Sequence, residues 1–278
     1  MAKNSNIEWT HHTFNPWWGC QKVSPACKHC YAQTWAKRCG GSDLWGSRSK
    51  RRFFTDKHWS DPIKWNRVAA ESGMRERVFC ASMADVFEDR KDLNEPRERL
   101  WELIEKTPQL DWLLLTKRIE EVDRLAPWST DWPDNVWLGS TVENQKYAKE
   151  RLPYLLNTNA KVKFLSCEPL LSELSIEEEL KEIDWVIAGG ESGPKSRPTN
   201  PDWLRSLRDQ CTHSNTAFHF KQWGNWFPMD SSTELNYKNK KILTVGSAIE
   251  MVNVGKKAAG RILDGKEWNE LPKVIGSN

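Results

Sequence analysis

The chain has 278 residues, 38% of them hydrophobic, and carries 41 Lys and Arg against 38 Asp and Glu for a net charge of +3. This length fits one large domain or two small ones. No run of eighteen apolar residues occurs, which excludes a membrane-spanning helix. The first twelve residues, MAKNSNIEWTHH, lack the apolar segment of a secretory signal, so we expect a cytoplasmic protein.

Cysteine and tryptophan usage narrow the class further. Seven Cys, an odd number in a reducing compartment, favour metal binding or catalysis over disulfides. The 17 Trp outnumber the nine Phe and four Tyr. Trp packs in cores and also stacks on nucleic-acid bases. We assign most of them to packing and a few to function.

In chain order, a first strand is expected over residues 7–14, followed by a cysteine segment and an inserted basic and aromatic loop over residues 39–60. Short apolar strands then alternate with helical stretches. The strands are expected over residues 77–87, 111–118, 135–144, 161–170, 184–193 and 216–224. Helices are expected over residues 95–107, 145–158 and 201–211, the last with Asn200 as its cap and Pro201 in its first turn.

Continuous apolar strands that alternate with helices predict a parallel sheet covered by helices. The expected fold class is therefore α/β, a partial or full TIM-like parallel barrel, with a doubly wound open sheet as the alternative. Residues 1–278 are expected to form a single domain. Residues 228–278 are expected to be an irregular C-terminal extension packed on the barrel.

Polar side chains follow the strands at their carboxyl ends, where parallel α/β proteins build their active sites. We expect them to line a common cavity. They are Ser82, Asp85, Thr116, Lys117, Ser140, Thr141, Glu143, Ser166, Glu168, Glu191, Ser192, Lys221 and Gln222. The GGESG stretch that contains Gly189 and Gly190 fits either a ligand-binding loop, with Arg197 nearby, or a tight structural turn.

The segment GCQKVSPACKHCYA places Cys20, Cys27 and Cys30 at C-x6-C-x2-C spacing. Thiolates are ligands for zinc and for iron–sulfur clusters. A structural zinc site needs a fourth ligand, for which His29 and Cys39 are the nearby candidates. In the other interpretation, three Cys hold a 4Fe–4S cluster, one iron stays open to a small molecule, and Trp18 and Tyr31 flank the cluster.

A basic run interleaved with aromatic residues lies in the inserted loop. Arg48, Lys50, Arg51 and Arg52 stand beside Phe53 and Phe54, a combination that suits a phosphate backbone with a splayed base. The alternative is a solvated loop. The same surface is expected to continue through Lys117, Arg118, Lys221, Gln222 and Trp223.

Several blocks together resemble the phage gene-product 37/68 family of radical S-adenosylmethionine-like barrels, which is distantly similar to spore photoproduct lyases. The blocks cover nearly the whole chain: NPWWGCQKVSPACKHCYA, FCASMADVFED, LLLTKR, WLGSTVEN, FLSCEPLL, WVIAGGESGPKSRP, FHFKQWG and AGRILDG. The usual radical S-adenosylmethionine spacing is C-x3-C-x2-C, so the first gap here is three residues longer. The GGE stretch, residues 189–191, follows the sixth expected strand when residues 7–14 are counted as the first.

The resemblance implies a 4Fe–4S cluster on Cys20, Cys27 and Cys30, with S-adenosylmethionine as a candidate second cofactor. It also implies UV-damaged DNA as the partner and a lyase that reductively splits pyrimidine dimers. The candidate catalytic residues are Glu143, Cys167, Glu168 and Glu191, where Cys167 is alternatively a buried core thiol. The candidate cofactor-binding residues are Trp18, Tyr31, Ser82, Asp85, Ser140, Thr141, Gly189, Gly190 and Ser192. The candidate nucleic-acid contacts are Arg48, Lys50, Arg51, Arg52, Lys117, Arg118, Arg197, Lys221, Gln222 and Trp223.

Two other functions stay open. The first is a radical S-adenosylmethionine enzyme that modifies a base, a peptide or a small metabolite. The second is a non-catalytic nucleic-acid-binding protein stabilised by zinc or by a cluster. A lined cavity at the strand ends favours an enzyme, because a binding module has no need for one.

Overall fold

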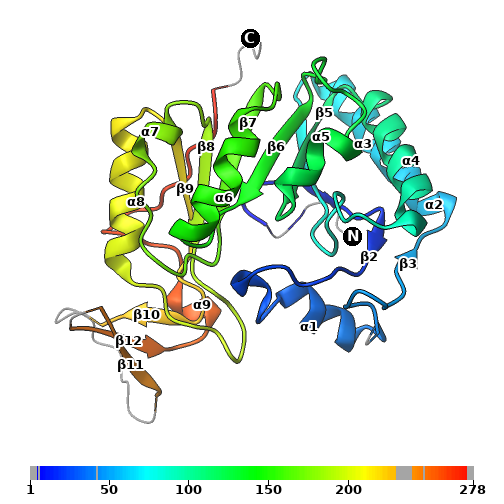
Figure 1. Cartoon of the computed structure of the whole chain (residues 1–278). Coiled ribbons are helices and arrows are strands. Elements are labelled where there is room, and N and C mark those ends of the chain that lie inside the picture. The colour runs from blue at the N-terminus through cyan, green and yellow to red at the C-terminus, as the bar shows by residue number, and fades with distance from the viewer. Residues whose placement is uncertain (1–4, 6, 42, 230–239, 247, 274–278) are drawn as a thin grey trace. The chain divides into compact units, whose positions relative to one another are not determined.

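The computed structural model describes residues 5, 7–41, 43–229, 240–246 and 248–273 (Figure 1). The chain divides into two compact units. The first contains Met1–Ser140 and Pro153–Lys163, and the second contains Thr141–Leu152 and Phe164–Asn278. The single domain expected from the sequence stays a prediction, and each unit is described by itself.

The fold is mixed α/β, and its seven-stranded sheet has the order β1-β4-β5-β6-β7-β8-β9. The seven strands expected from the sequence are all present, because continuous apolar runs between helices can only be buried as central parallel strands. Their bounds are β1 (His12–Phe14), β4 (Glu76–Cys80), β5 (Leu110–Thr116), β6 (Val136–Thr141), β7 (Val162–Cys167), β8 (Trp185–Gly189) and β9 (Ala217–Gln222). Within the described residues β1 and β9 are the ends of this order, so a full barrel, one of the two expected forms, is not formed.

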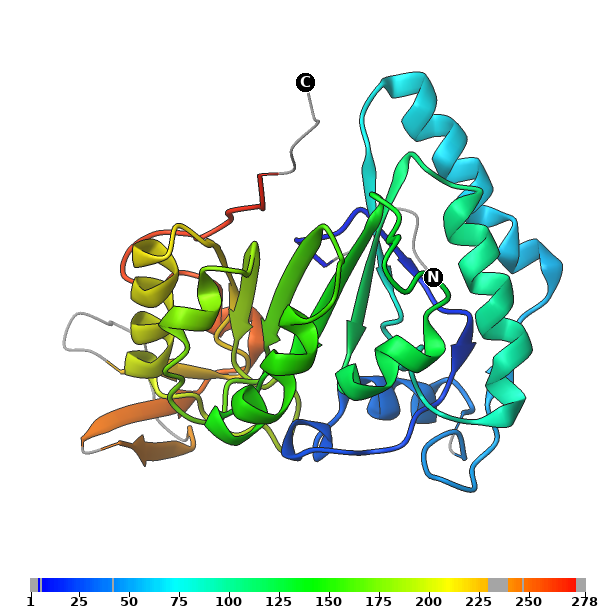
Figure 2. The same cartoon turned by 45° about the horizontal axis from the view of Figure 1, so that its top comes forward.

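In the first unit, β1, β4, β5 and β6 pair in parallel, with Phe14 opposite Cys80 and Cys80 opposite Leu114. Figure 2 shows α3 (Asp61–Ser72) and α4 (Asn94–Glu105) running alongside these strands. The core between them is aromatic: Phe14 and Trp112 are fully buried and meet edge to face at 5.7 Å. Three short helices also belong to the unit: η2 (Lys91–Leu93), η3 (Ile119–Glu121) and α5 (Val122–Leu125).

The N-terminal part of the first unit contains more regular structure than the sequence predicts. The cysteine segment includes η1 (Pro25–Cys27) and α1 (Tyr31–Arg38). Residues 39–60, expected as a loop, contain β3 (Arg52–Phe53) and α2 (Asp56–Trp59), and β3 pairs antiparallel with β2 (Trp17–Trp18). This pairing fastens the insertion to the chain just before the first cysteine.

In the second unit, residues 164–167 of β7 pair in parallel with β8, and β8 pairs in parallel with β9. The helices of this unit are α7 (Glu177–Leu180), α8 (Pro201–His213) and the first eight residues, 145–152, of α6 (Gln145–Leu156). The expected cap of α8 is confirmed, since the Asn200 side chain accepts a hydrogen bond from the Asp202 amide. The outer edge of β9 is covered by a later segment: the Phe220 amide donates to the Trp268 carbonyl, and the Glu270 amide donates to the Phe218 carbonyl.

The C-terminal extension expected to be irregular forms a small antiparallel sheet of order β10-β12-β11. Its strands are β10 (Trp226–Pro228), β11 (Ile242–Val245) and β12 (Ile249–Asn253), and α9 (Lys256–Ala259) follows them. Residues 230–239, 247 and 274–278 of this extension lie outside the described residues. Among the helices that the structure describes, none combines the length and the apolar character needed to cross a membrane.

Candidate functional site

The three clustered cysteines lie in one loop of the first unit and are partly exposed, whereas Cys80, Cys167 and Cys211 are buried. Cys27 ends η1, and Cys30 is the N-cap residue of α1. Cys39 is exposed and sits at the opposite end of α1, as its C-cap. At 1.5 Å of rise per residue, α1 separates Cys30 from Cys39 by about 13 Å along its axis, which removes Cys39 from the group.

Gly19 allows the chain to enter this loop. Its φ is +116°, and a Cβ atom there would lie 2.5 Å from the Leu44 carbonyl oxygen and 2.8 Å from Cδ of Arg51. No other residue fits that conformation and that space. The Gly19 amide donates to the Met83 carbonyl, and the Gly46 amide donates to the Cys20 carbonyl, so the loop is joined to the segment after β4 and to the insertion.

A second anchor joins the loop to the end of β4. Asn15 donates from Nδ2 to Oγ of Ser82 at 3.0 Å and accepts from the Met83 amide at 2.7 Å. The Tyr31 hydroxyl donates to the Ser82 carbonyl at 3.0 Å. Ser82 and Tyr31, both expected near a cofactor, are therefore brought together. Trp18 and Cys30 pack on the same small cluster of Ala32, Ala36 and Met83.

A buried Arg–Asp pair reaches the first cysteine from the carboxyl end of β5. Arg118 donates from Nη1 to Asp85 at 2.9 Å and to Sγ of Cys20 at 3.8 Å, and from Nη2 to the Gln21 carbonyl at 2.8 Å. Asp85 also accepts from the Thr116 hydroxyl and from the Lys117 amide. Asp85 is thus fully engaged with protein groups. Arg118 is buried at 8% exposure, in contrast to the basic surface expected from the sequence.

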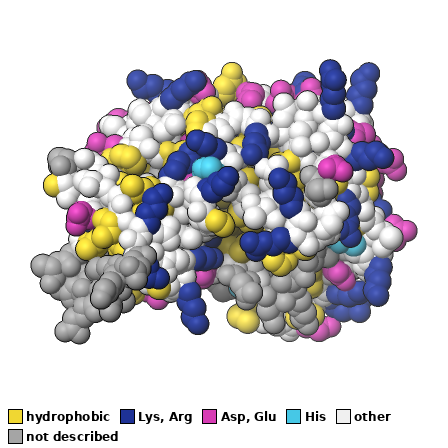
Figure 3. Space-filling model, turned by 90° about the horizontal axis from the view of Figure 1, so that it is seen from below, with side chains coloured by type: hydrophobic (Ala, Val, Ile, Leu, Met, Phe, Trp, Pro, Cys, Tyr) yellow, Lys and Arg dark blue, Asp and Glu magenta, His cyan; other side chains and the backbone are white. Residues whose placement is uncertain are grey.

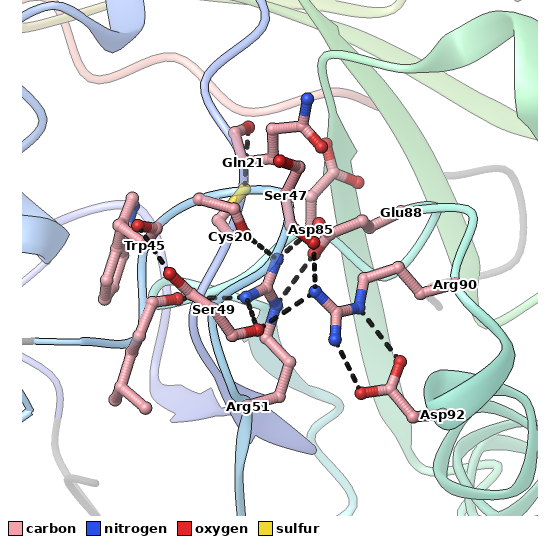
Figure 4. Close-up of polar contacts among 12 residues, drawn as sticks. Cys20, Gln21, Trp45, Ser47, Ser49, Arg51, Asp85, Glu88, Arg90 and Asp92 are labelled. Atoms are coloured by element: carbon pink, nitrogen blue, oxygen red, sulfur yellow. Dashed lines mark hydrogen bonds and ion pairs between the residues drawn. The ribbon is translucent and has the colours of Figure 1, made fainter.

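A second buried Arg–acid pair organises the insertion. Arg51 meets Glu88 through two hydrogen bonds of 3.1 and 2.5 Å and donates to the carbonyls of Leu44, Gly46, Ser49 and Lys50. Arg90 donates to the carbonyls of Ser47 and Ser49 and is itself held by Asp92. Figure 4 shows these two guanidinium groups meeting at Ser49, with Asp92 bound to that of Arg90. Glu88 and Arg90 were not singled out in the sequence, although Glu88 lies in the block that contains Asp85 and Arg90 directly follows that block.

The two ends of the cysteine loop differ electrostatically. Burial raises the pKa of the Cys20 thiol to about 12, although the charge of Arg118 opposes this change. Burial also acts to raise the pKa of Cys27, but the charge of Lys117 and hydrogen bonds from Val23 and Ser24 together bring it below its ordinary value. Arg118 and Lys117, two successive residues after β5, therefore act on two different cysteines.

The donor set of this loop fits an iron–sulfur cluster better than it fits zinc. Three thiols are grouped within eleven residues, thiolate is the ligand that such clusters prefer, and Cys39 is separated from them by α1. Within the described ranges, however, no group of three or more Cys, His, Asp or Glu side chains is arranged to hold a metal ion. The ligands are thus present in one loop, without a converged geometry.

The basic run separates into exposed and buried members. Arg48, Lys50 and Arg52 are exposed, whereas Arg51 is buried at 5% exposure, contrary to the expected basic surface. The guanidinium of Arg52 lies 5.1 Å from the Trp18 ring centroid and 5.7 Å from that of Phe54. Figure 3 shows dark blue Lys and Arg side chains spread over the face in view, with hydrophobic side chains between them.

In the second unit, the end of β7 meets the end of β9. Lys221 donates to Glu168 at 2.8 Å, and Nε2 of Gln222 donates to the other oxygen of Glu168 at 3.3 Å. Gly189 of β8 lies between them, and a Cβ atom there would be 3.0 Å from the Gln222 carbonyl oxygen. Lys221 and Glu168 are partly exposed and Gln222 is buried, so Gln222 does not form the exposed surface expected of it.

The GGESG stretch is packed against the turn after β9. A Cβ atom on Gly190 would lie 2.0 Å from the Trp223 carbonyl oxygen. Glu191 accepts hydrogen bonds from the amide, Nε and Nη2 of Arg197. These bonds join residues 191 and 197 and so stabilise the loop between them. Trp223 is buried and donates to the Ile262 carbonyl at 2.7 Å, again in contrast to the exposed position expected. These contacts support the structural interpretation of the glycines.

Most of the other predicted site residues are buried. Glu143 pairs with Arg151 at 2.8 Å, and Arg151, which was not predicted, also donates to the Thr141 carbonyl. Ser140 is fully buried at the end of β6. Cys167 is fully buried, and both burial and Glu143 raise the pKa of its thiol. Ser192 is partly exposed. The catalytic and cofactor roles of all these residues stay predictions.

Together the fold and the loop define a mixed α/β protein with three partly exposed thiols at the carboxyl end of its first parallel strands. Residues 4–272 match the sequence model of a family described as protein of unknown function (DUF5131), and the chain belongs to that family. No curated protein sequence matches the chain. The expected membership of the phage gene-product 37/68 family is not confirmed by these findings.

Solved structures with some similarity are those of spore photoproduct lyase. A mutant with bound AdoMet and dinucleoside spore photoproduct is 12% identical, with a TM-score of 0.45 over 88% of this chain and 68% of that chain. A complex with dinucleoside spore photoproduct is also 12% identical, with a TM-score of 0.47 over 92% of this chain and 72% of that chain. A TM-score below 0.5 at this identity does not establish a common fold.

Proposed function

We propose that this chain is an iron–sulfur enzyme whose cluster is held by Cys20, Cys27 and Cys30. The observation that carries the proposal is the grouping of three partly exposed thiols in a loop that Asn15, Tyr31 and Arg118 fasten to the carboxyl ends of two parallel strands. Three thiolates leave one iron of a 4Fe–4S cluster without a protein ligand, which is where a small molecule would bind.

A cluster held there would supply single electrons, and the chain's own residues would position it and its substrate. Arg118 and the Gly19 entry fix the first ligand, while Tyr31 fixes the start of α1. The exposed Arg48, Lys50 and Arg52 would contact the phosphate backbone of a nucleic acid. The finer proposal is reductive splitting of UV-induced pyrimidine dimers in DNA, with S-adenosylmethionine as a candidate second cofactor and light as the alternative source of the driving force.

The metal content tests the first part of the proposal. Protein purified without oxygen should be brown and contain about four irons and four sulfides per chain. The Cys20→Ala, Cys27→Ala and Cys30→Ala variants should each lose most of the iron, while Cys39→Ala should keep it. One zinc per chain and no iron would support the zinc-stabilised alternative and overturn the proposal.

The substrate needs a separate experiment. A UV-irradiated oligonucleotide is incubated with the iron-loaded protein in light and in darkness, each with and without S-adenosylmethionine. Restoration of the undamaged bases in at least one condition is expected, and the cluster-free Cys27→Ala variant serves as the control. Failure in all four conditions, with a protein that contains its iron, would remove the repair activity and leave an iron–sulfur enzyme with another substrate.

A further inference from the structure

A buried cation from outside the cysteine loop reaches the first cysteine and has a buried acid as its partner. Side-chain exposure is 9% for Arg118 and 7% for Asp85, and their charged atoms are 2.9 Å apart. Arg118 comes from the end of β5 and Asp85 from the segment after β4. Neither belongs to the loop, yet Arg118 reaches both Sγ of Cys20 and the backbone carbonyl of the next residue.

This ion pair holds the loop in place and also places a positive charge next to Cys20. Charges interact strongly where water is excluded, and an ion pair whose cation lies on the side of a redox centre presents a directed dipole to it. The net charge around an iron–sulfur cluster, together with hydrogen bonds to its sulfurs, sets its reduction potential. Partners behind the ligands have comparable effects on other metal sites.

We propose that Arg118 is a positioning residue that also raises the reduction potential of the centre on Cys20, and that Asp85 limits this effect. The inference rests on the proposed cluster. Reduction adds one electron, taken from the reductant, and makes the cluster more negative by one charge without breaking a bond. The cation of Arg118 stabilises that extra negative charge, whereas the carboxylate of Asp85 opposes it.

The other charged groups near the pair are engaged with each other. Glu88 is bound by Arg51, whose guanidinium also holds the insertion, so these two charges nearly cancel. The charge of Lys117 acts on Cys27, and Lys117 stays unchanged in every variant below. Arg118 and Asp85 are therefore the two charges that can be altered singly with opposite predicted signs.

The experiment measures the midpoint potential of the full-length, cluster-loaded protein by anaerobic titration with dithionite. Visible absorbance and electron paramagnetic resonance report the reduced cluster. The variants are Arg118→Gln, Arg118→Lys, Asp85→Asn and the double variant Arg118→Gln/Asp85→Asn. Arg124→Gln is the matched control, because Arg124 is a half-exposed cation of the same unit that pairs with Asp89 and Glu121.

We expect Arg118→Gln to shift the potential to more negative values and Asp85→Asn to shift it to less negative values. The double variant should lie between them, Arg118→Lys near the wild type, and Arg124→Gln at the wild-type value. A role confined to holding the loop would lower the iron content without producing shifts of opposite sign.

Two single variants that keep their iron and shift in the same direction, or not at all, would overturn the inference. If Arg118→Gln does not fold, Asp85→Asn and the double variant still decide. The midpoint potential of Asp85→Asn must be less negative than that of the wild type, and the potential of the double variant must be more negative than that of Asp85→Asn. The wild-type iron content tests the proposed function separately. A wild type that binds no iron refutes the cluster, whereas a loaded wild type with unshifted variants refutes only the role of this pair.

Discussion

At the scale of single residues, neighbours in the sequence can have opposite environments. Arg48, Lys50 and Arg52 face solvent, while Arg51 in the same run is buried against Glu88. A count of basic residues cannot separate them, because burial depends on which side chain finds an acid 37 positions further along the chain. The guanidinium of Arg51 has five donors and can satisfy several carbonyls of the insertion at once.

Replacing Arg51 is therefore predicted to affect stability. Arg51→Ala leaves Glu88 as an uncompensated buried charge, which costs about 3–5 kcal/mol in the free energy of unfolding. Arg48→Ala, three positions away and exposed, should change it by no more than about 0.5 kcal/mol. Denaturant unfolding of both variants checks this, and equal stabilities would mean that the Arg51–Glu88 pair contributes little.

Cys39 provides a second prediction at this scale. The sequence left it open as a fourth ligand, and its place at the far end of α1 takes it away from Cys30. Cys39→Ser should therefore keep the full metal content of the wild type, whereas Cys30→Ser should lose most of it. Metal analysis of the two variants, purified side by side without oxygen, makes the comparison. Equal losses would restore a four-cysteine site.

At the scale of elements, glycines decide how closely strands and loops approach. Gly189 and Gly190 lie where β8 ends against the turn after β9, and the space there leaves no room for a side chain. The sequence placed them at the end of a strand and left two interpretations open. The observed packing explains the glycines without any ligand.

This packing gives a prediction for Gly190. Gly190→Ala forces the new methyl group against the Trp223 carbonyl and should destabilise the protein by about 3 kcal/mol, as expected for overpacking. Gly40→Ala is the control: Gly40 has φ +77° but no atom within 4 Å of the new Cβ, so only a backbone cost of about 1 kcal/mol is expected. Thermal unfolding in the absence of any cofactor distinguishes the two, and a smaller loss at Gly190 would argue against the packing explanation.

At the scale of the whole molecule, a net charge of +3 is too small to make nucleic-acid binding a property of the entire surface. Binding, if it follows the proposed function, must come from local groups such as the exposed basic residues of the insertion. Several Lys and Arg elsewhere are paired with acids, as Arg205 and Arg208 are with Asp264. The salt dependence of nucleic-acid binding is therefore expected to reflect the few phosphate contacts made by these exposed basic residues.

Removing three of those charges should change that dependence. The triple variant Arg48→Ala/Lys50→Ala/Arg52→Ala is predicted to reduce the slope of log K against log salt by about 2–3, at about 0.7–0.9 per lost phosphate contact. Replacing the exposed Lys64, Lys106 and Lys161 by Ala removes the same net charge and should leave the slope nearly unchanged. Fluorescence anisotropy with a labelled oligonucleotide over a range of salt concentrations measures both, and equal slopes would contradict the assigned surface.

The sequence alone determined the seven parallel strands, the helix cap at Asn200 and the grouping of three thiols, since each depends on local pattern: apolar runs, capping chemistry and ligand spacing. Only the tertiary structure decided that Arg118, Asp85, Arg51 and Glu88 are buried pairs, that Cys39 stands apart, and that β1 and β9 end an open strand order. Those features depend on which distant side chains meet once the strands are aligned. Ion-pair partners come from separate elements, and a local pattern does not identify them.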